Sequence, residues 1–177
     1  MYWANKFKIA NQFLQTEADI DQDFYIKENG ASTNAISTLN EKYSFIPEEY
    51  FKFLSISDGA DIAQCTLFSS LDYAKGKEMY SNAYPEKHWF PFGHESGGDP
   101  LLLHESGKVA IGFGKNISGK YNFICDNFSD FLGEVLMGPK YPLLFRIKTD
   151  AFNEFIEEES EDDPWLAFLI KQNWLNV

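Results

Sequence analysis

Residues 46–59 read IPEEYFKFLSISDG, and this stretch has the features of a short helix with a defined start and a defined end. Pro47 suits the first turn, where its missing N–H group would have had no partner. Two glutamates follow at positions where the helix dipole favours negative charge. The aromatic and aliphatic side chains at 50–54 can form a buried face, and Gly59 can adopt the left-handed conformation of a helix cap.

Two more helices are predicted on the N-terminal side of this stretch. Apolar residues recur at helical spacing within residues 1–20, namely Trp3, Phe7, Ala10 and Leu14. After an acidic linker at 19–23, Ser32 can cap a second helix whose apolar stripe ends at Tyr43.

After Gly59 the apolar spacing changes to alternation, which is typical of strands. Strands are predicted at 63–68, 90–93, 101–104, 109–113, 122–125 and 142–147. Helices are predicted at 71–80, from Asp126 to Gly138, around Phe152 and Phe155, and from Pro164 onward. The order of helices, then strands, then helices predicts an α+β fold with a central antiparallel or mixed sheet flanked by helices.

Length and composition indicate one domain over 1–177 with a substantial core. The chain has 177 residues, of which 44% are hydrophobic and 17% aromatic. With 27 acidic and 15 basic side chains the net charge is −12, so the chain repels phosphate backbones. We therefore expect no nucleic-acid partner and expect attraction to a basic protein.

The two cysteines and the apolar pattern predict a reduced protein outside the membrane. Two cysteines, Cys65 and Cys125, are too few for a disulfide framework, and the sequence contains no CxxC motif. Both cysteines lie in predicted strands, where cysteine usually packs as a small hydrophobic residue. No apolar run approaches the roughly 18 residues of a membrane helix, and no signal peptide is visible. A cytoplasmic location is expected.

The glycine-rich loop at 94–99, HESGGD, lies between two predicted strands and matches no phosphate-binding motif. We interpret it as a hairpin loop. The tetrapeptide HESG occurs at 94–97 and again at 104–107, so a metal site containing His94 and His104 is conceivable. The spacing of His94 and His104 fits no known pattern of metal ligands, and His88 stands at no recognisable ligand spacing from either of them. We therefore predict no metal and no cofactor. No catalytic motif is present, and no enzymatic activity is expected.

An acidic run near the C-terminus contains seven carboxylates in ten residues. Its members are Glu154, Glu157, Glu158, Glu159, Glu161, Asp162 and Asp163. Such a run is often only a solvated surface. With a net charge of −12, it is also a candidate docking surface for a basic partner, because complementary charge speeds encounter.

Three motifs in order resemble the SUKH superfamily of Smi/Knr-like proteins. The first is the helix at 46–54 with its Asp-Gly stop, the second is WFPFG at 89–93 with Gly-Gly-Asp at 97–99, and the third is FSDFL at 128–132. The positions carrying the resemblance are Pro47, Tyr50, Leu54, Gly59, Gly98, Asp99, Phe128, Phe131 and Leu132. The similarity covers residues 30–137. It implies a SUKH-like core over 30–147, with an N-terminal helical extension and a C-terminal acidic helical tail.

The resemblance implies binding rather than catalysis. Bacterial members of this superfamily resemble immunity proteins that block toxins, many of them nucleases, whereas fungal members are regulatory proteins. The expected function is therefore a non-enzymatic immunity protein that occludes a basic toxin domain. Two alternatives remain open: an intracellular regulatory or scaffold module without a toxin partner, and an enzyme with an unrecognised site.

Overall fold

The computed structural model describes residues 1–16, 24–73, 78–80, 88–112 and 122–175. The α-helices are α1 (Tyr2–Thr16), α2 (Thr33–Lys42), α3 (Glu48–Ile56), α5 (Phe128–Asp130), α6 (Phe152–Glu159) and α7 (Pro164–Lys171). A π-helix, η1 (Phe131–Leu136), continues α5, and η2 (Tyr141–Phe145) and η3 (Thr149–Ala151) are 3-10 helices. The strands are β1 (Tyr25–Ile26), β2 (Ala60–Ile62), β3 (Cys65–Leu67), β4 (Trp89–Glu95), β5 (Pro100–His104), β6 (Val109–Ile111) and β7 (Asn122–Cys125).

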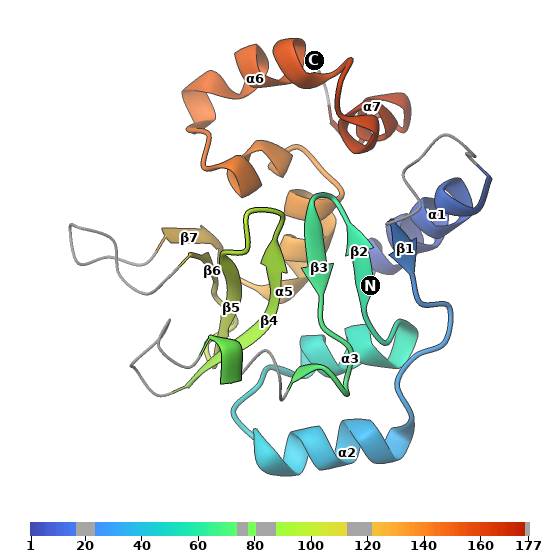
Figure 1. The fold of residues 1–177 in the computed structure, drawn as a ribbon, viewed down its shortest axis with the longest axis vertical. Coiled ribbons are helices and arrows are strands. Elements are labelled where there is room, and N and C mark those ends of the chain that lie inside the picture. The colour runs from blue at the N-terminus through green and yellow to red at the C-terminus, as the bar shows by residue number, and fades with distance from the viewer. Residues whose placement is uncertain (17–23, 74–77, 81–87, 113–121, 176–177) are drawn as a thin grey trace.

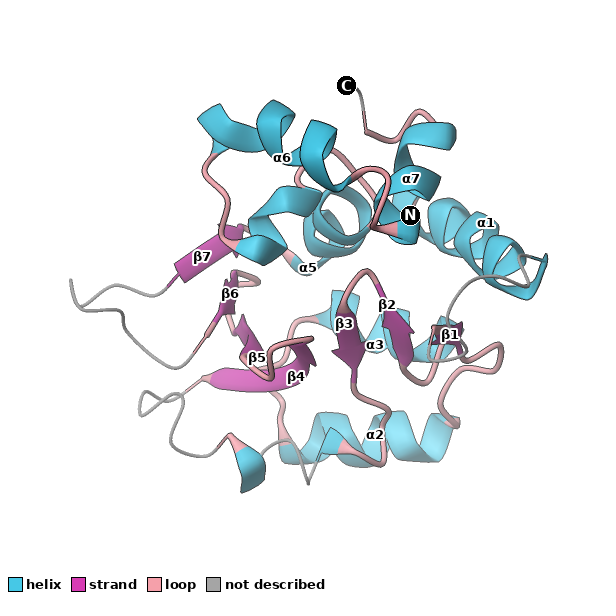
Figure 2. Ribbon diagram, turned by 45° about the horizontal axis from the view of Figure 1, so that its top comes forward, coloured by secondary structure: helices cyan, strands magenta, loops and turns pink. Residues whose placement is uncertain are grey.

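The seven strands form one antiparallel sheet in the order of the chain, β1 to β7 (Figure 1). In Figure 2 the sheet crosses the middle of the molecule, with α1, α5, α6 and α7 on one side and α2 on the other. The predicted α+β class is thus confirmed, and the sheet is antiparallel rather than mixed. None of the helices in the described ranges is long and apolar enough to cross a bilayer.

Aromatic rings from all three sequence motifs meet in the centre of the core. The ring of Phe128 lies 5.3 Å from Tyr50 and 5.2 Å from Phe92, and Phe131 lies 5.1 Å from Phe92. These pairs are arranged edge to face, which is favourable for aromatic side chains. Leu54 and Leu132 are fully buried in the same cluster. The spacing of the motifs therefore reflects one shared packing unit.

The segment outside the expected core at the N-terminus is part of the same packing unit. Trp3 and Phe7 of α1 are buried, and the ring of Phe7 lies 5.7 Å from Phe53 of α3. Lys6 donates from Nζ to the carbonyls of Gly133 (2.8 Å), within the π-helix, and Met137 (2.7 Å), directly after it. These contacts fix α1 against η1, so the predicted extension belongs to the folded body.

Several local predictions are confirmed, and the role of Gly59 needs correction. The Ser32 side chain accepts from the backbone N–H of Ala35 at the start of α2, as predicted. Pro47 is the N-cap residue of α3, one position before the first turn in which it was expected. The helix α3, however, ends at Ile56 with Ser57 in an extended conformation. Gly59 has φ of +101°, but it leads the backbone into β2 rather than capping the helix.

One strand predicted at 63–68 is in fact the second half of a tight hairpin. Ala63 and Gln64 have φ of 55° and 59° and form the turn between β2 and β3. Positive φ at two successive residues is the geometry of a two-residue hairpin turn. Neither residue is a usual turn former in this conformation. The alternating apolar pattern therefore gave no sign of the turn, and the predicted strand included both turn residues. The short β1 was also not predicted.

The last predicted strand, 142–147, is wrong. Residues Tyr141–Phe145 form the 3-10 helix η2, in which Leu143 N–H donates to the carbonyl of Lys140. Pro142 has no N–H for a sheet ladder but fits the first turn of a helix. Arg146, with φ of 60°, then ends η2.

The helix at the third motif starts one residue later than predicted and has an unexpected form. Asn127, not Asp126, caps it by accepting from the N–H of Asp130.

The predicted linker at 19–23 lies outside the described residues. So do residues 74–77 of the helix predicted at 71–80, and residue 113 of the strand predicted at 109–113.

Candidate functional site

The acidic run lies on α6 and on the turn that joins α6 to α7. Six of its seven carboxylate residues are exposed, and we call this set the acidic face. It comprises Glu154, Glu157, Glu158, Glu159, Glu161 and Asp162. Within the described part of the chain none of the six forms an ion pair, so their charge is available to an outside partner.

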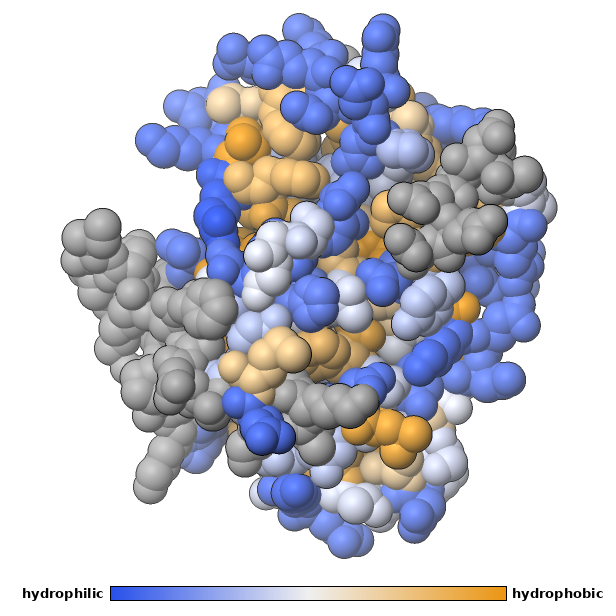
Figure 3. Space-filling view, in the orientation of Figure 1, coloured by the Kyte–Doolittle hydropathy of each residue, from blue (hydrophilic) through white to orange (hydrophobic). Residues whose placement is uncertain are grey.

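Beside the acidic face lies a small apolar area. Of the α6 side chains only Ile156 is fully buried, while Phe152 and Phe155 are half-buried. The ring of Phe155 lies 4.9 Å from Phe145, which is 36% exposed. Figure 3 shows hydrophilic side chains along the upper edge of the molecule, where Figure 1 places α6, with a hydrophobic area below them. An apolar centre with a charged rim is the usual composition of a protein interface.

The seventh carboxylate, Asp163, does not belong to this face, so the prediction that it binds a partner is wrong. Asp163 is 8% exposed. Its Oδ1 accepts from the N–H groups of Trp165 (2.9 Å) and Leu166 (3.1 Å), and its Oδ2 accepts from the Tyr141 hydroxyl (2.7 Å). Asp163 is therefore the N-cap of α7, and its carboxylate is committed to the fold.

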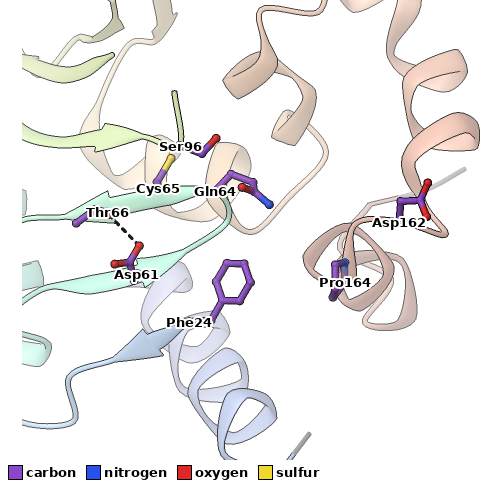
Figure 4. Close-up of a pocket in the computed structure, with 8 residues that line it drawn as sticks. All are labelled: Phe24, Asp61, Gln64, Cys65, Thr66, Ser96, Asp162 and Pro164. Atoms are coloured by element: carbon purple, nitrogen blue, oxygen red, sulfur yellow. Dashed lines mark hydrogen bonds between the residues drawn. The ribbon is translucent and has the colours of Figure 1, made fainter. Parts of the chain in front are cut away.

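A cavity of about 470 Å³ opens between the sheet and the α6–α7 turn. It is lined by Phe24, Asp61, Gln64, Cys65, Thr66, Ser96, Asp162 and Pro164. In Figure 4, Phe24 and Gln64 project from the sheet side, Pro164 lies across from them on the tail, and Asp162 stands further out beyond Pro164. The acidic face thus continues into a cavity whose other wall belongs to the β2–β3 hairpin. We call this cavity the tail pocket.

The tail pocket carries negative charge from two sides. Asp61 accepts a hydrogen bond from the Thr66 hydroxyl (2.9 Å) on one wall, and Asp162 stands on the other.

Burial, followed by the charges of Glu95 and Asp61, holds the pKa of the Cys65 thiol well above its usual value. The same cause, burial, raises the pKa of Cys125 to about 12. Both thiols are thus held protonated, which disfavours a role as nucleophiles.

The Gly-Asp motif serves the hairpin between β4 and β5. Gly98 has φ of +88°, a conformation that side chains other than glycine rarely adopt. The Glu95 carboxylate accepts from the N–H groups of Gly97 (2.8 Å) and Asp99 (2.7 Å), and Asp99 forms an ion pair with Arg146. The loop is therefore a structural turn tied to the end of η2, as its position between strands indicated.

His94 lies apart from the other two histidines, which stand at the same end of the β4–β5 ladder. His94 is paired with Pro100 and His104 with Trp89, so the two stand at opposite ends of the β4–β5 ladder. His88 contacts Glu105, with 2.8 Å between Nδ1 and Oε2. Over the described ranges no three His, Cys, Asp or Glu side chains are grouped as metal ligands. The repeated HESG therefore does not bring its two imidazoles together.

Sequence reasoning identified the acidic face but not the tail pocket. Phe24, Asp61 and Asp162 are far apart in the chain, and no local pattern joins them. The run of seven carboxylates was the only sequence signal near the pocket, and it belongs only to the wall formed by the α6–α7 turn. The opposite wall depends on the β2–β3 turn, which the alternation pattern did not reveal.

Comparison with known proteins places these features relative to a family. The SMI1 / KNR4 family (SUKH-1) matches residues 30–134, a span that contains all nine motif positions. The matched span includes the hairpin wall of the tail pocket, whereas α1, α6 and α7 lie outside it. A search of curated proteins gave no match. Because the match covers more than half of the chain, the protein belongs to the SMI1 / KNR4 family, SUKH-1.

Proposed function

We propose that this protein is a non-enzymatic immunity protein that binds a cognate bacterial toxin domain and blocks it by occlusion. The observation that carries the proposal is the acidic face, six exposed carboxylates without ion-pair partners among the described residues. A toxin that acts on nucleic acid needs a positive surface to hold phosphate. An acidic surface of this kind can cover that site and compete with the substrate.

The apolar area beside the acidic face supports a protein rather than a small ion as the partner. Phe145 and Phe155 offer apolar contact area, and the surrounding carboxylates offer charge. Long-range attraction between opposite charges accelerates encounter, and short-range apolar contact slows dissociation. A cytoplasmic location would place the protein where a nuclease toxin acts, and it forms part of this proposal.

The proposal is tested by co-expressing the protein in a bacterial host with the toxin domain encoded by the neighbouring gene. The wild type is expected to restore growth and to be recovered in a complex with the toxin. An α6-neutral variant, with Glu154→Gln, Glu157→Gln and Glu158→Gln, should protect less well. The matched control removes the same charge elsewhere on the exposed surface, at Glu28, Glu41 and Glu78.

The outcome separates immunity from the alternative of a regulatory or scaffold module. If the wild type neither binds the neighbouring product nor restores growth, the immunity function is wrong. If both triple variants lose protection equally, net charge rather than the acidic face is responsible. A regulatory module would instead bind a host protein that has no toxic activity.

A further inference from the structure

Another cavity, of about 350 Å³, opens beside β7, the last strand in the order of the sheet. Figures 1 and 2 show β7 at the opposite end of the sheet from β1. The walls of the cavity come from β6, from β7 and from the segment 143–149, which joins η2 to η3. We call it the edge pocket. The described residues that line it are Ile111, Asn122, Phe123, Ile124, Leu143, Arg146, Ile147, Lys148 and Thr149.

Most of the side chains that line the edge pocket are apolar. Ile111 and Ile124 belong to the buried core, and Leu143 packs partly buried against it. Ile147 is half-buried on the opposite wall. An apolar group among these side chains would be removed from water, and the volume of the pocket is in the range that small ligands occupy.

The charged side chains of the edge pocket are positive. Arg146 and Lys148 contribute to the lining, and none of its described residues is Asp or Glu. Lys148 is exposed, and its ammonium group forms no ion pair within the described ranges. Although the chain has a net charge of −12, this pocket would therefore attract an anionic group.

Arg146 is fixed at the pocket by its ion pair with Asp99. A guanidinium has five N–H donors, so a pair with one carboxylate leaves donors for a second acceptor. A β-carbon at Gly112, directly after β6, would lie 3.7 Å from Nη2 of Arg146. The guanidinium thus lies close to the backbone at the end of β6. Because Asp99 offsets its charge, Lys148 supplies the uncompensated charge of the pocket.

We propose that the edge pocket binds a small carboxylate with an apolar body. The carboxylate is attracted by Lys148 and Arg146, and the apolar body enters among Ile111, Ile124 and Ile147. This inference goes beyond the proposed immunity function, because it concerns a separate cavity and needs no toxin. A free acid and the C-terminal residue of another chain both present this chemistry.

The test uses the full chain labelled with ¹⁵N and four small probes. Isocaproate has the carboxylate and the apolar body, isocaproamide lacks the charge, and acetate lacks the apolar body. Isocaproate should shift the amide signals of Ile111, Ile124 and Ile147 in a saturable way, and the two control probes should not. N-acetyl-leucine represents a chain end. Binding of isocaproate would identify a free acid as sufficient, and binding of N-acetyl-leucine alone would identify a chain end; either result supports a carboxylate site.

Two exposed lysines provide matched variants. Lys148→Gln removes the unpaired charge of the pocket, and Lys27→Gln removes one charge directly after β1, at the opposite edge of the sheet. Lys148→Gln should weaken binding of the carboxylate probe by roughly fivefold, which corresponds to about 1 kcal/mol. Lys27→Gln should leave the affinity within about twofold. Unchanged amide signals away from the substituted position would show that each variant is folded.

The proposal is overturned if neither isocaproate nor N-acetyl-leucine binds, or if isocaproamide or acetate shifts the same signals equally. It is also overturned if Lys148→Gln and Lys27→Gln bind the carboxylate probe with equal affinity, or if the shifted signals lie away from β6, β7 and the segment 143–149. The growth assay with the toxin is independent of these measurements, so failure of one proposal leaves the other standing.

Discussion

The helices α6 and α7 are neighbours of equal length that meet solvent in opposite ways. α7 buries Trp165, Leu166, Phe168 and Leu169, whereas α6 fully buries only Ile156. The boundary between them falls between two adjacent aspartates, since Asp162 is exposed and Asp163 is the buried cap of α7. The seven carboxylates of the acidic run therefore have two different roles. One of them, Asp163, holds the fold, and the other six face outward.

The strongest test of this contrast is the removal of a buried ring from α7. Trp165 is 2% exposed, and its Nε1 donates to the carbonyl of Leu136 (2.8 Å). Trp165→Ala should lower the free energy of unfolding by about 3–5 kcal/mol, because it leaves a cavity and an unpaired carbonyl. Urea unfolding measures the change. Phe155→Ala, at a half-buried position on α6, is the control and should cost clearly less. Equal costs would mean that α6 is as firmly docked as α7.

The two aspartates at the boundary give the next largest difference. Asp163→Ala removes the cap of α7 and leaves the hydroxyl of Tyr141 without its acceptor, which should cost about 2–3 kcal/mol. Asp162→Ala should change stability by no more than about 0.5 kcal/mol, as is usual for exposed positions. Thermal unfolding of both variants at one pH measures this difference. If both substitutions cost the same, Asp163 is not the cap described here.

The smallest expected effect on stability concerns the charges of α6. Glu154 and Glu158 are four residues apart on one helix, where like charges repel each other. The α6-neutral variant should therefore be as stable as the wild type or slightly more stable. A midpoint of denaturation shifted clearly downward would mean that these glutamates form contacts within the fold. In that case they would not be free for a partner.

The parts of the fold that could be predicted are those fixed by local signals. Pro47, the two glutamates after it and the aromatic spacing are enough to predict α3 from its own residues. Ser32 at the start of α2 and Pro164 in the first turn of α7 act in the same way. Each signal involves residues within one or two helical turns, so a single sequence is enough.

The parts that could not be predicted depend on contacts between distant residues. The segment after Pro142 alternates like a strand, yet it forms η2 because the sheet does not reach it and Arg146 is paired with Asp99. The burial of Asp163 depends on the hydrogen bond from the Tyr141 hydroxyl, and this contact cannot be seen in the acidic run itself. The tail pocket combines residues from four separated segments. Composition predicted the charge of this region, and only the fold revealed how the charge is arranged.

The central claim, that the acidic face brings a basic partner in, is tested most directly by association kinetics. The rate for the wild type and the neighbouring-gene toxin domain should fall between about 0.1 M and about 1 M salt, as the Debye length shrinks from about 10 Å to about 3 Å. The α6-neutral variant should associate more slowly at low salt and respond less to added salt, whereas the control at Glu28, Glu41 and Glu78 should resemble the wild type. If the wild type and the α6-neutral variant associate at the same rate and neither responds to salt, electrostatic docking by the acidic face is contradicted.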